Sequence, residues 1–150
     1  MTFLPILVLA LVWPQPAPSP QQAQPAPASP QEAGGGSLEH TYWQLTRLGE
    51  TAVVVKGLPR EPHLTFYPGG SVIGADGCNA LSGHYESAGG TLSIQAPLMG
   101  TLMTCTLPDE LDRRFRELLG EVRQWRATAM SLELLDEQRA ILARFDAVPY

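Results

Sequence analysis

The side chains that could do chemistry gather in a glycine-rich segment, and a second cysteine follows twenty-seven positions after the first. The early group is Asp76, Cys78 and His84, and the later residue is Cys105. A cysteine with a histidine base and a carboxylate orienter is the side-chain set of a nucleophilic site. The same four residues are ligand types that bind zinc or copper.

Both interpretations meet obstacles. A catalytic thiolate needs a helix N-terminus or a nearby cation to lower its pKa. Cys105 does precede an expected helix, but no oxyanion arrangement is legible, and the spacing matches no recognised metal pattern. We expect no catalytic residue, no metal and no cofactor, so the chain is predicted not to be an enzyme. A redox or metal-handling protein acting through Cys78 and Cys105 is kept as the alternative.

The charge of the chain argues against a nucleic-acid partner. The formal net charge is -5, and the densest basic group is Arg113, Arg114 and Arg116. These arginines fall on an expected amphipathic helix, where we expect them to form a solvated face. Phosphate binding depends on dense positive charge, so nucleic acid is disfavoured.

The N-terminal segment 1–28 resembles a secretory signal peptide. No charged residue precedes Glu32, and Phe3 to Val12 is an apolar run of ten residues. Such a run is too short for a helix across a bilayer of about 30 Å, and it fits a signal core. Two features depart from the pattern, since Pro5 interrupts the run and no basic residue precedes it.

Export follows as an expectation. A small-x-small cleavage pattern occurs at Ala26-Pro27-Ala28, and no cysteine precedes Cys78 to carry a lipid near the apolar run. We expect a periplasmic or secreted protein without a transmembrane span once the signal is removed. Residues 29–40 continue a Pro/Ala/Gly-rich stretch that predicts an extended, jointed linker. The globular domain is then expected over 41–150.

Within that domain, two hairpins are marked by their turns. Pro68-Gly69-Gly70 separates the β-prone runs 63–67 and 71–74, and Ala88-Gly89-Gly90 separates 84–87 from 91–94. Glycine supplies the positive φ that tight turns need. Further strands are expected at 42–45, 52–55, 124–127, 131–135 and 141–145, with a turn at 136–138. The segment 74–85, with three glycines and an asparagine, is expected to form a tightly shaped loop.

One amphipathic helix breaks this pattern. Its apolar stripe has helical spacing and consists of Leu111, Phe115, Leu118, Leu119 and Val122. Thr106 and Asp109 read as a capping-box variant, Pro108 fits the first turn, and Asp109 with Glu110 complements the helix dipole. The fold class is therefore α+β, with a curved, partly barrel-like antiparallel β-sheet and one packed α-helix.

The expected core combines the inward strand positions with the helix stripe. It consists of Trp43, Leu45, Leu64, Phe66, Ile73, Tyr85, Leu92, Ile94, Phe115, Leu118, Leu119, Leu132, Leu134 and Phe145. Met99, Met103 and Met130 are expected in the core or at its rim, and His40 and His63 at the surface.

Five ordered motifs in this domain resemble the META domain family, also called HslJ-like. They are Trp43-Gln44-Leu45, Leu64-Thr65-Phe66, Gly74 to Asn79, Gly83-His84-Tyr85, and Thr101 to Cys105. The residues that carry the motifs are Trp43, Gly74, Gly77, Asn79, Gly83, Tyr85, Thr101 and Met103, and their expected role is structural. The resemblance implies a bacterial envelope- and stress-associated protein, often secreted or lipid-anchored, without an established enzymatic activity.

We therefore expect a non-enzymatic exported module that binds an envelope partner protein or a small apolar ligand. Cys78 and Cys105 are predicted to form a disulfide. Disulfides persist in oxidising compartments, and two cysteines pair without leaving an odd thiol. Both also belong to the segments that carry the resemblance. A bridge between them would tie the start of the helix to the sheet.

Overall fold

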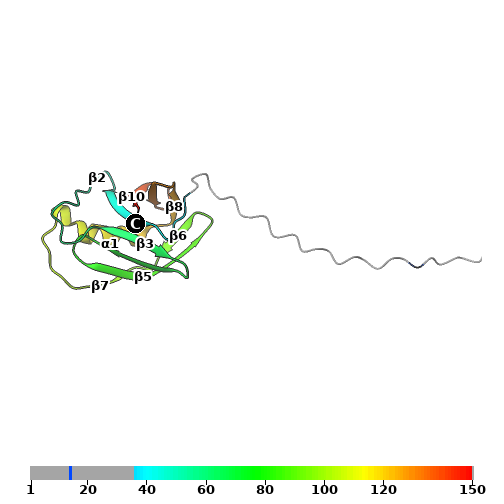
Figure 1. Ribbon diagram of the computed structural model, residues 1–150, viewed down its shortest axis with the longest axis horizontal. Helices are drawn as coiled ribbons and strands as arrows, with labels where there is room; N and C mark the ends of the chain where they lie inside the picture. The colour runs from blue at the N-terminus through cyan, green and yellow to red at the C-terminus, as the bar shows by residue number, and fades with distance from the viewer. Residues whose placement is uncertain (1–13, 15–35, 150) are drawn as a thin grey trace, which may run out of the picture.

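Eight antiparallel strands close into a barrel in the computed structural model, which describes Pro14 and residues 36–149 (Figure 1). In chain order the barrel strands are β1 (Tyr42–Leu48), β3 (His63–Tyr67), β4 (Ser71–Ala75), β5 (Ala80–Ala88), β6 (Thr91–Ile94), β8 (Gln124–Ala127), β9 (Ser131–Leu135) and β10 (Ile141–Val148). Each pairs with the next, and β1 pairs with β10 to close the ring. The sheet is thus a complete barrel, where the sequence indicated a partly closed one.

Three short elements complete the fold. β2 (Thr51–Ala52) pairs with β1, and β7 (Met99–Gly100) pairs with β5 beyond the end of β6. The helix α1 (Leu111–Glu121) follows the 3-10 turn η1 (Pro108–Glu110). In Figure 1, α1 lies toward the end of the barrel opposite the point where residue 36 meets the domain.

The predicted core is buried throughout, with the exception of Ile73. The β3–β4 turn sets the register so that Phe66 lies opposite Val72 and Thr65 opposite Ile73. Val72 is fully buried and Ile73 is 43% exposed, because neighbouring residues of a strand point to opposite faces. The choice of Ile73 was therefore wrong by one position.

The helix packs as its stripe predicts. Leu111, Phe115, Leu118 and Leu119 are buried on α1, and the ring centroid of Phe115 lies 6.2 Å from that of Phe145 on β10. Its N-terminus differs from the prediction, because Leu107 and Glu110 occupy the cap positions of η1 and α1 and neither makes a side-chain cap hydrogen bond. The capping role expected for Thr106 is not present.

Two further boundaries differ from the prediction. Only Ala52 of the expected strand 52–55 belongs to a strand, and the loop expected over 74–85 shrinks to the four residues between β4 and β5. Leu38, placed in the linker by composition, is buried in the core. The signal-like segment and the remainder of the linker lie outside the described residues, apart from Pro14.

Candidate functional site

The loop between β4 and β5 is organised around the carboxylate of Asp76, which is completely buried. Its Oδ1 accepts hydrogen bonds from the backbone N–H groups of Cys78, at 2.9 Å, and Asn79, at 2.6 Å. The N–H of Asp76 in turn donates to the carbonyl of Asn79 at 3.1 Å. An aspartate that accepts from backbone N–H groups two and three residues ahead fixes a turn from within.

The second oxygen of Asp76 reaches the helix. Arg116 Nε donates to Asp76 Oδ2 at 2.6 Å, in an ion pair whose arginine side chain is 35% exposed and whose aspartate is buried. The loop and α1 are therefore locked together by charge as well as by packing. Nothing in the helical periodicity distinguishes Arg116 from the neighbouring arginines, so the pair was missed from sequence.

Asn79 holds the segment that leads toward the helix, residues 99–105, which we call the strap. Asn79 Oδ1 accepts from the N–H of Met103 at 2.7 Å and from the hydroxyl of Thr101 at 2.8 Å. Asn79 Nδ2 donates to the carbonyl of Met103 at 3.2 Å. The asparagine amide thus replaces a strand partner for the strap just beyond β7.

A disulfide between Cys78 and Cys105 fixes the far end of the strap. The two Cα atoms lie 5.9 Å apart, within the range that a disulfide requires. Cys78 is completely buried, and Cys105 is half-buried. The predicted pairing is present, so neither sulfur is a free thiolate for nucleophilic attack or metal binding.

Close approach to backbone explains one motif glycine, Gly74, and backbone conformation explains another, Gly77, whereas the near contact at Gly83 is with the end of a leucine side chain that can move. A Cβ on Gly74 would lie 2.2 Å from the carbonyl oxygen of His63, and one on Gly83 would lie 2.4 Å from Leu98 Cδ2. Gly77 has a φ of +101°, which side-chain-bearing residues rarely adopt. Gly74 and Gly77 therefore shape the loop and the strand beside it.

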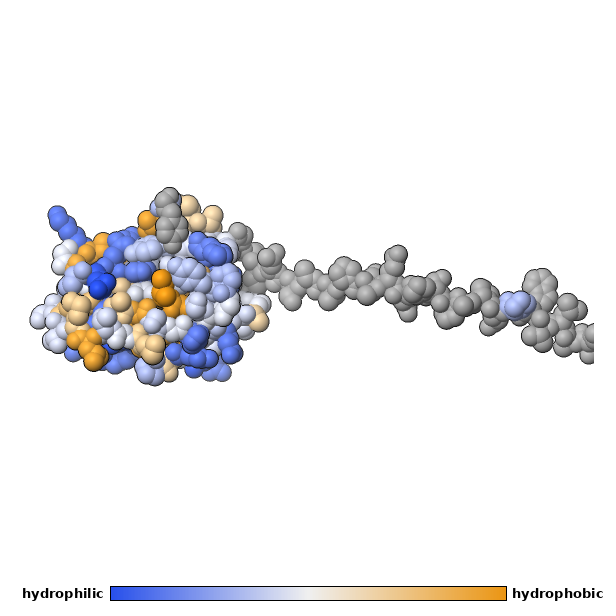
Figure 2. Space-filling model, turned by 60° about the horizontal axis from the view of Figure 1, so that its bottom comes forward, coloured by the Kyte–Doolittle hydropathy of each residue, from blue (hydrophilic) through white to orange (hydrophobic). Residues whose placement is uncertain are grey.

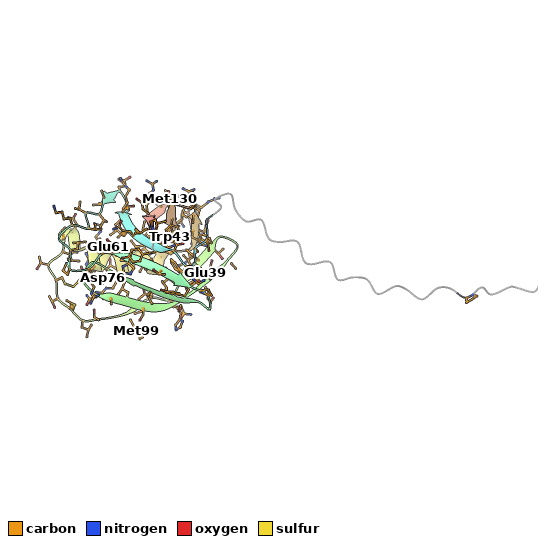
Figure 3. All side chains as sticks on the ribbon, in the orientation of Figure 1. Glu39, Trp43, Glu61, Asp76, Met99 and Met130 are labelled. Atoms are coloured by element: carbon orange, nitrogen blue, oxygen red, sulfur yellow. A yellow bond between two sulfur atoms is a disulfide. The ribbon has the colours of Figure 1, made fainter. Side chains whose placement is uncertain are left out.

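The other motif residues lie at the opposite end of the barrel. The indole N–H of Trp43 donates to the carbonyl of Leu38 at 2.9 Å. The Tyr85 hydroxyl donates to Glu39 Oε1 at 2.7 Å and to the carbonyl of Tyr67 at 3.0 Å. Burial, and then the adjacent Glu39 carboxylate, raise the pKa of Tyr85 above its usual value. These two side chains anchor the residues that precede β1, and Figure 3 shows Glu39 and Asp76 well apart.

His84 does not join Asp76 and Cys78. It is exposed on β5, four residues beyond Ala80, a distance of about 13 Å along a strand. Among the described residues no group of three or more His, Cys, Asp or Glu side chains could hold a metal ion. The fold therefore separates His84 from Asp76 and Cys78, which are close to it in sequence.

The strap presents apolar side chains to solvent. Met99 is 75% exposed, Leu102 98% and Met103 49%. Met130, between β8 and β9, is also exposed, so none of the three methionines expected in the core or at its rim is a core residue. Met99 lies at the lower edge of the view in Figure 3, and Figure 2 turns that side forward and shows hydrophobic patches between hydrophilic ones.

Within the described part of the chain, no helix has the length and apolar character needed to cross a membrane. The structural class is a small closed antiparallel barrel with one packed helix. A disulfide links the G-x-x-G-C-N turn to the segment before that helix. The META domain family model matches residues 36–149, and the chain belongs to that family. The resemblance drawn from the five motifs is confirmed.

Solved structures support the same fold. An NMR structure of a protein that is 27% identical aligns with a TM-score of 0.56 over 72% of this chain and 90% of that one. A protein from Burkholderia xenovorans, 23% identical, aligns with a TM-score of 0.59 over 75% of this chain and 85% of its own. A DUF4847 family protein from Bacteroides vulgatus, 14% identical, gives 0.52 over 73% and 93%. No curated protein matches the chain.

Proposed function

We propose that this protein is an exported envelope module that acts by binding a partner protein, with the strap as its contact surface. The observation that carries the proposal is the exposure of Met99, Leu102 and Met103 on a segment that is firmly held. Exposed apolar side chains that gather on one segment favour an interaction site. Asn79 and the disulfide fix this segment in advance, which reduces the entropy lost on binding.

The motif chemistry supports binding over catalysis. Asp76 and Asn79 are each engaged by several hydrogen bonds within the loop and strap. Among the described residues, no buried side-chain nitrogen or oxygen lacks a hydrogen-bond partner. Of the residues that resembled a reactive set, Asp76 therefore fixes the loop, and Cys78 and Cys105 hold the strap through their disulfide, while His84 lies apart from them.

Export is tested by the N-terminus of the protein recovered from its native cell. The uncharged start and the apolar run Phe3 to Val12 lead us to expect a shortened chain outside the cytoplasm. N-terminal sequencing of the fractionated protein measures this directly. Recovery of intact Met1 in the cytoplasm alone would contradict export while leaving the binding proposal open to its own test.

Partner binding is tested by photo-crosslinking in the native envelope with a reactive side chain placed at Leu102. We expect one saturable crosslinked protein, because Leu102 is the most exposed apolar residue of the strap. The matched control carries the same group at Met130, which is 67% exposed but lies between β8 and β9.

A second variant makes the result specific. Met103→Asp should lower the yield of the crosslink at position 102 by about tenfold or more, since a charge would be buried at an apolar contact. Equal crosslinking from positions 102 and 130, or a yield that Met103→Asp leaves unchanged, would rule out the strap as the contact surface.

A further inference from the structure

A cavity of about 260 Å³ lies between the chain after β1 and the start of α1. Leu48 and Leu111 are buried in its wall, Val53 and Leu58 are half-buried, and Val54 is 73% exposed. The lining is thus largely aliphatic, although the loop that carries it is open to solvent on one side. A site with such walls favours an apolar group.

One cation lines the same cavity without a partner. Within the described residues Arg114 makes no hydrogen bond or ion pair, although it is half-buried. Its neighbours on α1 are engaged, because Arg113 pairs with Glu110 and Glu117, and Arg116 pairs with Asp76. A half-buried guanidinium left unpaired among aliphatic side chains is suited to a carboxylate.

We propose that this cavity binds a short single-chain amphiphilic carboxylate, with its chain against Leu48, Leu58 and Leu111 and its head group on Arg114. The volume sets the size, because drug-sized ligands occupy cavities of about 300–1,000 Å³ and this one is smaller. Asp109 also lines the cavity and repels the head group. This site is separate from the strap, so the inference goes beyond the proposed partner binding.

The test is a calorimetric titration of the purified protein with butyrate, hexanoate and octanoate. Each added methylene should tighten binding by about fourfold until the cavity is filled. Octanol has the same chain as octanoate without its charge, and it separates the apolar contribution from the ionic one. Dihexanoyl phosphatidylglycerol should bind no tighter than hexanoate, since the cavity has room for one chain.

Two variants of the head-group site have opposite expected effects. Arg114→Gln should weaken octanoate binding by about tenfold or more and leave octanol unchanged, because only the charge-assisted contact is lost. Asp109→Asn should tighten octanoate binding, because a repelling charge is removed. Arg113→Gln, an exposed arginine on the same helix, is the matched control and should change neither titration.

Leu58→Trp, which fills the cavity, should abolish binding of both compounds while the strap crosslink persists. Absence of saturable octanoate binding, an affinity independent of chain length, or equal losses from Arg114→Gln and Arg113→Gln would overturn the proposal. None of these results bears on the strap, whose crosslink has its own readout.

Discussion

Truncating Phe115 to alanine should lower the free energy of unfolding by about 3–5 kcal/mol, a large fraction of the roughly 5–15 kcal/mol that holds a domain of this kind together. Phe115 is completely buried and lies against Phe145 of β10, so its ring joins the helix to the last strand of the barrel. A cavity at this position would remove packing contacts from both α1 and β10. Chemical denaturation of the oxidised protein measures the loss.

The control for this substitution is Leu102→Ala, which removes an apolar side chain that is 98% exposed. Its effect on stability should stay within about 0.5 kcal/mol, because exposed positions without special contacts tolerate truncation. If Phe115→Ala were as mild as Leu102→Ala, α1 would not pack against the barrel core.

Removing the Cys78–Cys105 disulfide should cost about 3–4 kcal/mol. The closed loop spans a sequence separation of 27, and the chain-entropy model assigns that value to a loop of this length. The double variant Cys78→Ala/Cys105→Ala and the reduced wild-type protein should agree, since both release the same constraint on the unfolded chain. Denaturation in the presence and absence of reductant measures the difference.

The disulfide can affect both the stability of the domain and the position of the strap, and the hydrogen bonds made by Asn79 allow these two effects to be measured separately. These hydrogen bonds hold the strap at Thr101 and Met103 independently of the sulfur atoms, so the reduced protein should remain folded with its strap in place. Adding Asn79→Ala to the double cysteine variant should free the strap. A double cysteine variant as stable as the wild type would show that the bridge does not constrain the unfolded chain.

The hairpins were predictable because their turn residues act locally. Gly69, Gly70, Gly89 and Gly90 all have positive φ, as the two expected turns require. Which face each strand buries is a different matter, since it depends on the register across the turn. Ile73 and Val72 are both β-branched and apolar, and only the pairing of Phe66 with Val72 decides which one lies inside.

Barrel closure and the loop contacts could not be read from the sequence for a related reason. The seam between β1 and β10, and the ion pair between Asp76 and Arg116, join residues that lie far apart in the chain. Periodicity reports the environment of one element at a time. The cysteine pair could be predicted because the number of cysteines and the expected oxidising compartment are properties of the whole chain, not of one element.

The same reasoning explains why Asp76, Cys78 and His84 do not come together as a nucleophilic set. These residues are near in sequence, but β5 begins at Ala80 and carries His84 away along the sheet. An extended strand separates residues that a helix would have brought together. The glycines, asparagine and aspartate of this segment instead define one turn and the segment that it holds.

The seam between β1 and β10 also determines when the domain can finish folding. Tyr42 lies opposite Val148 and Trp43 opposite Ala147, so the first and last strands depend on each other. A chain that emerges N-terminus first, from a ribosome or through a translocation pore, leaves β1 short of one neighbour until its final residues follow. Contacts this distant in sequence form slowly. During such N-to-C emergence the barrel is incomplete and has unpaired strand edges, and it closes only when the last few residues of the domain pair with β1.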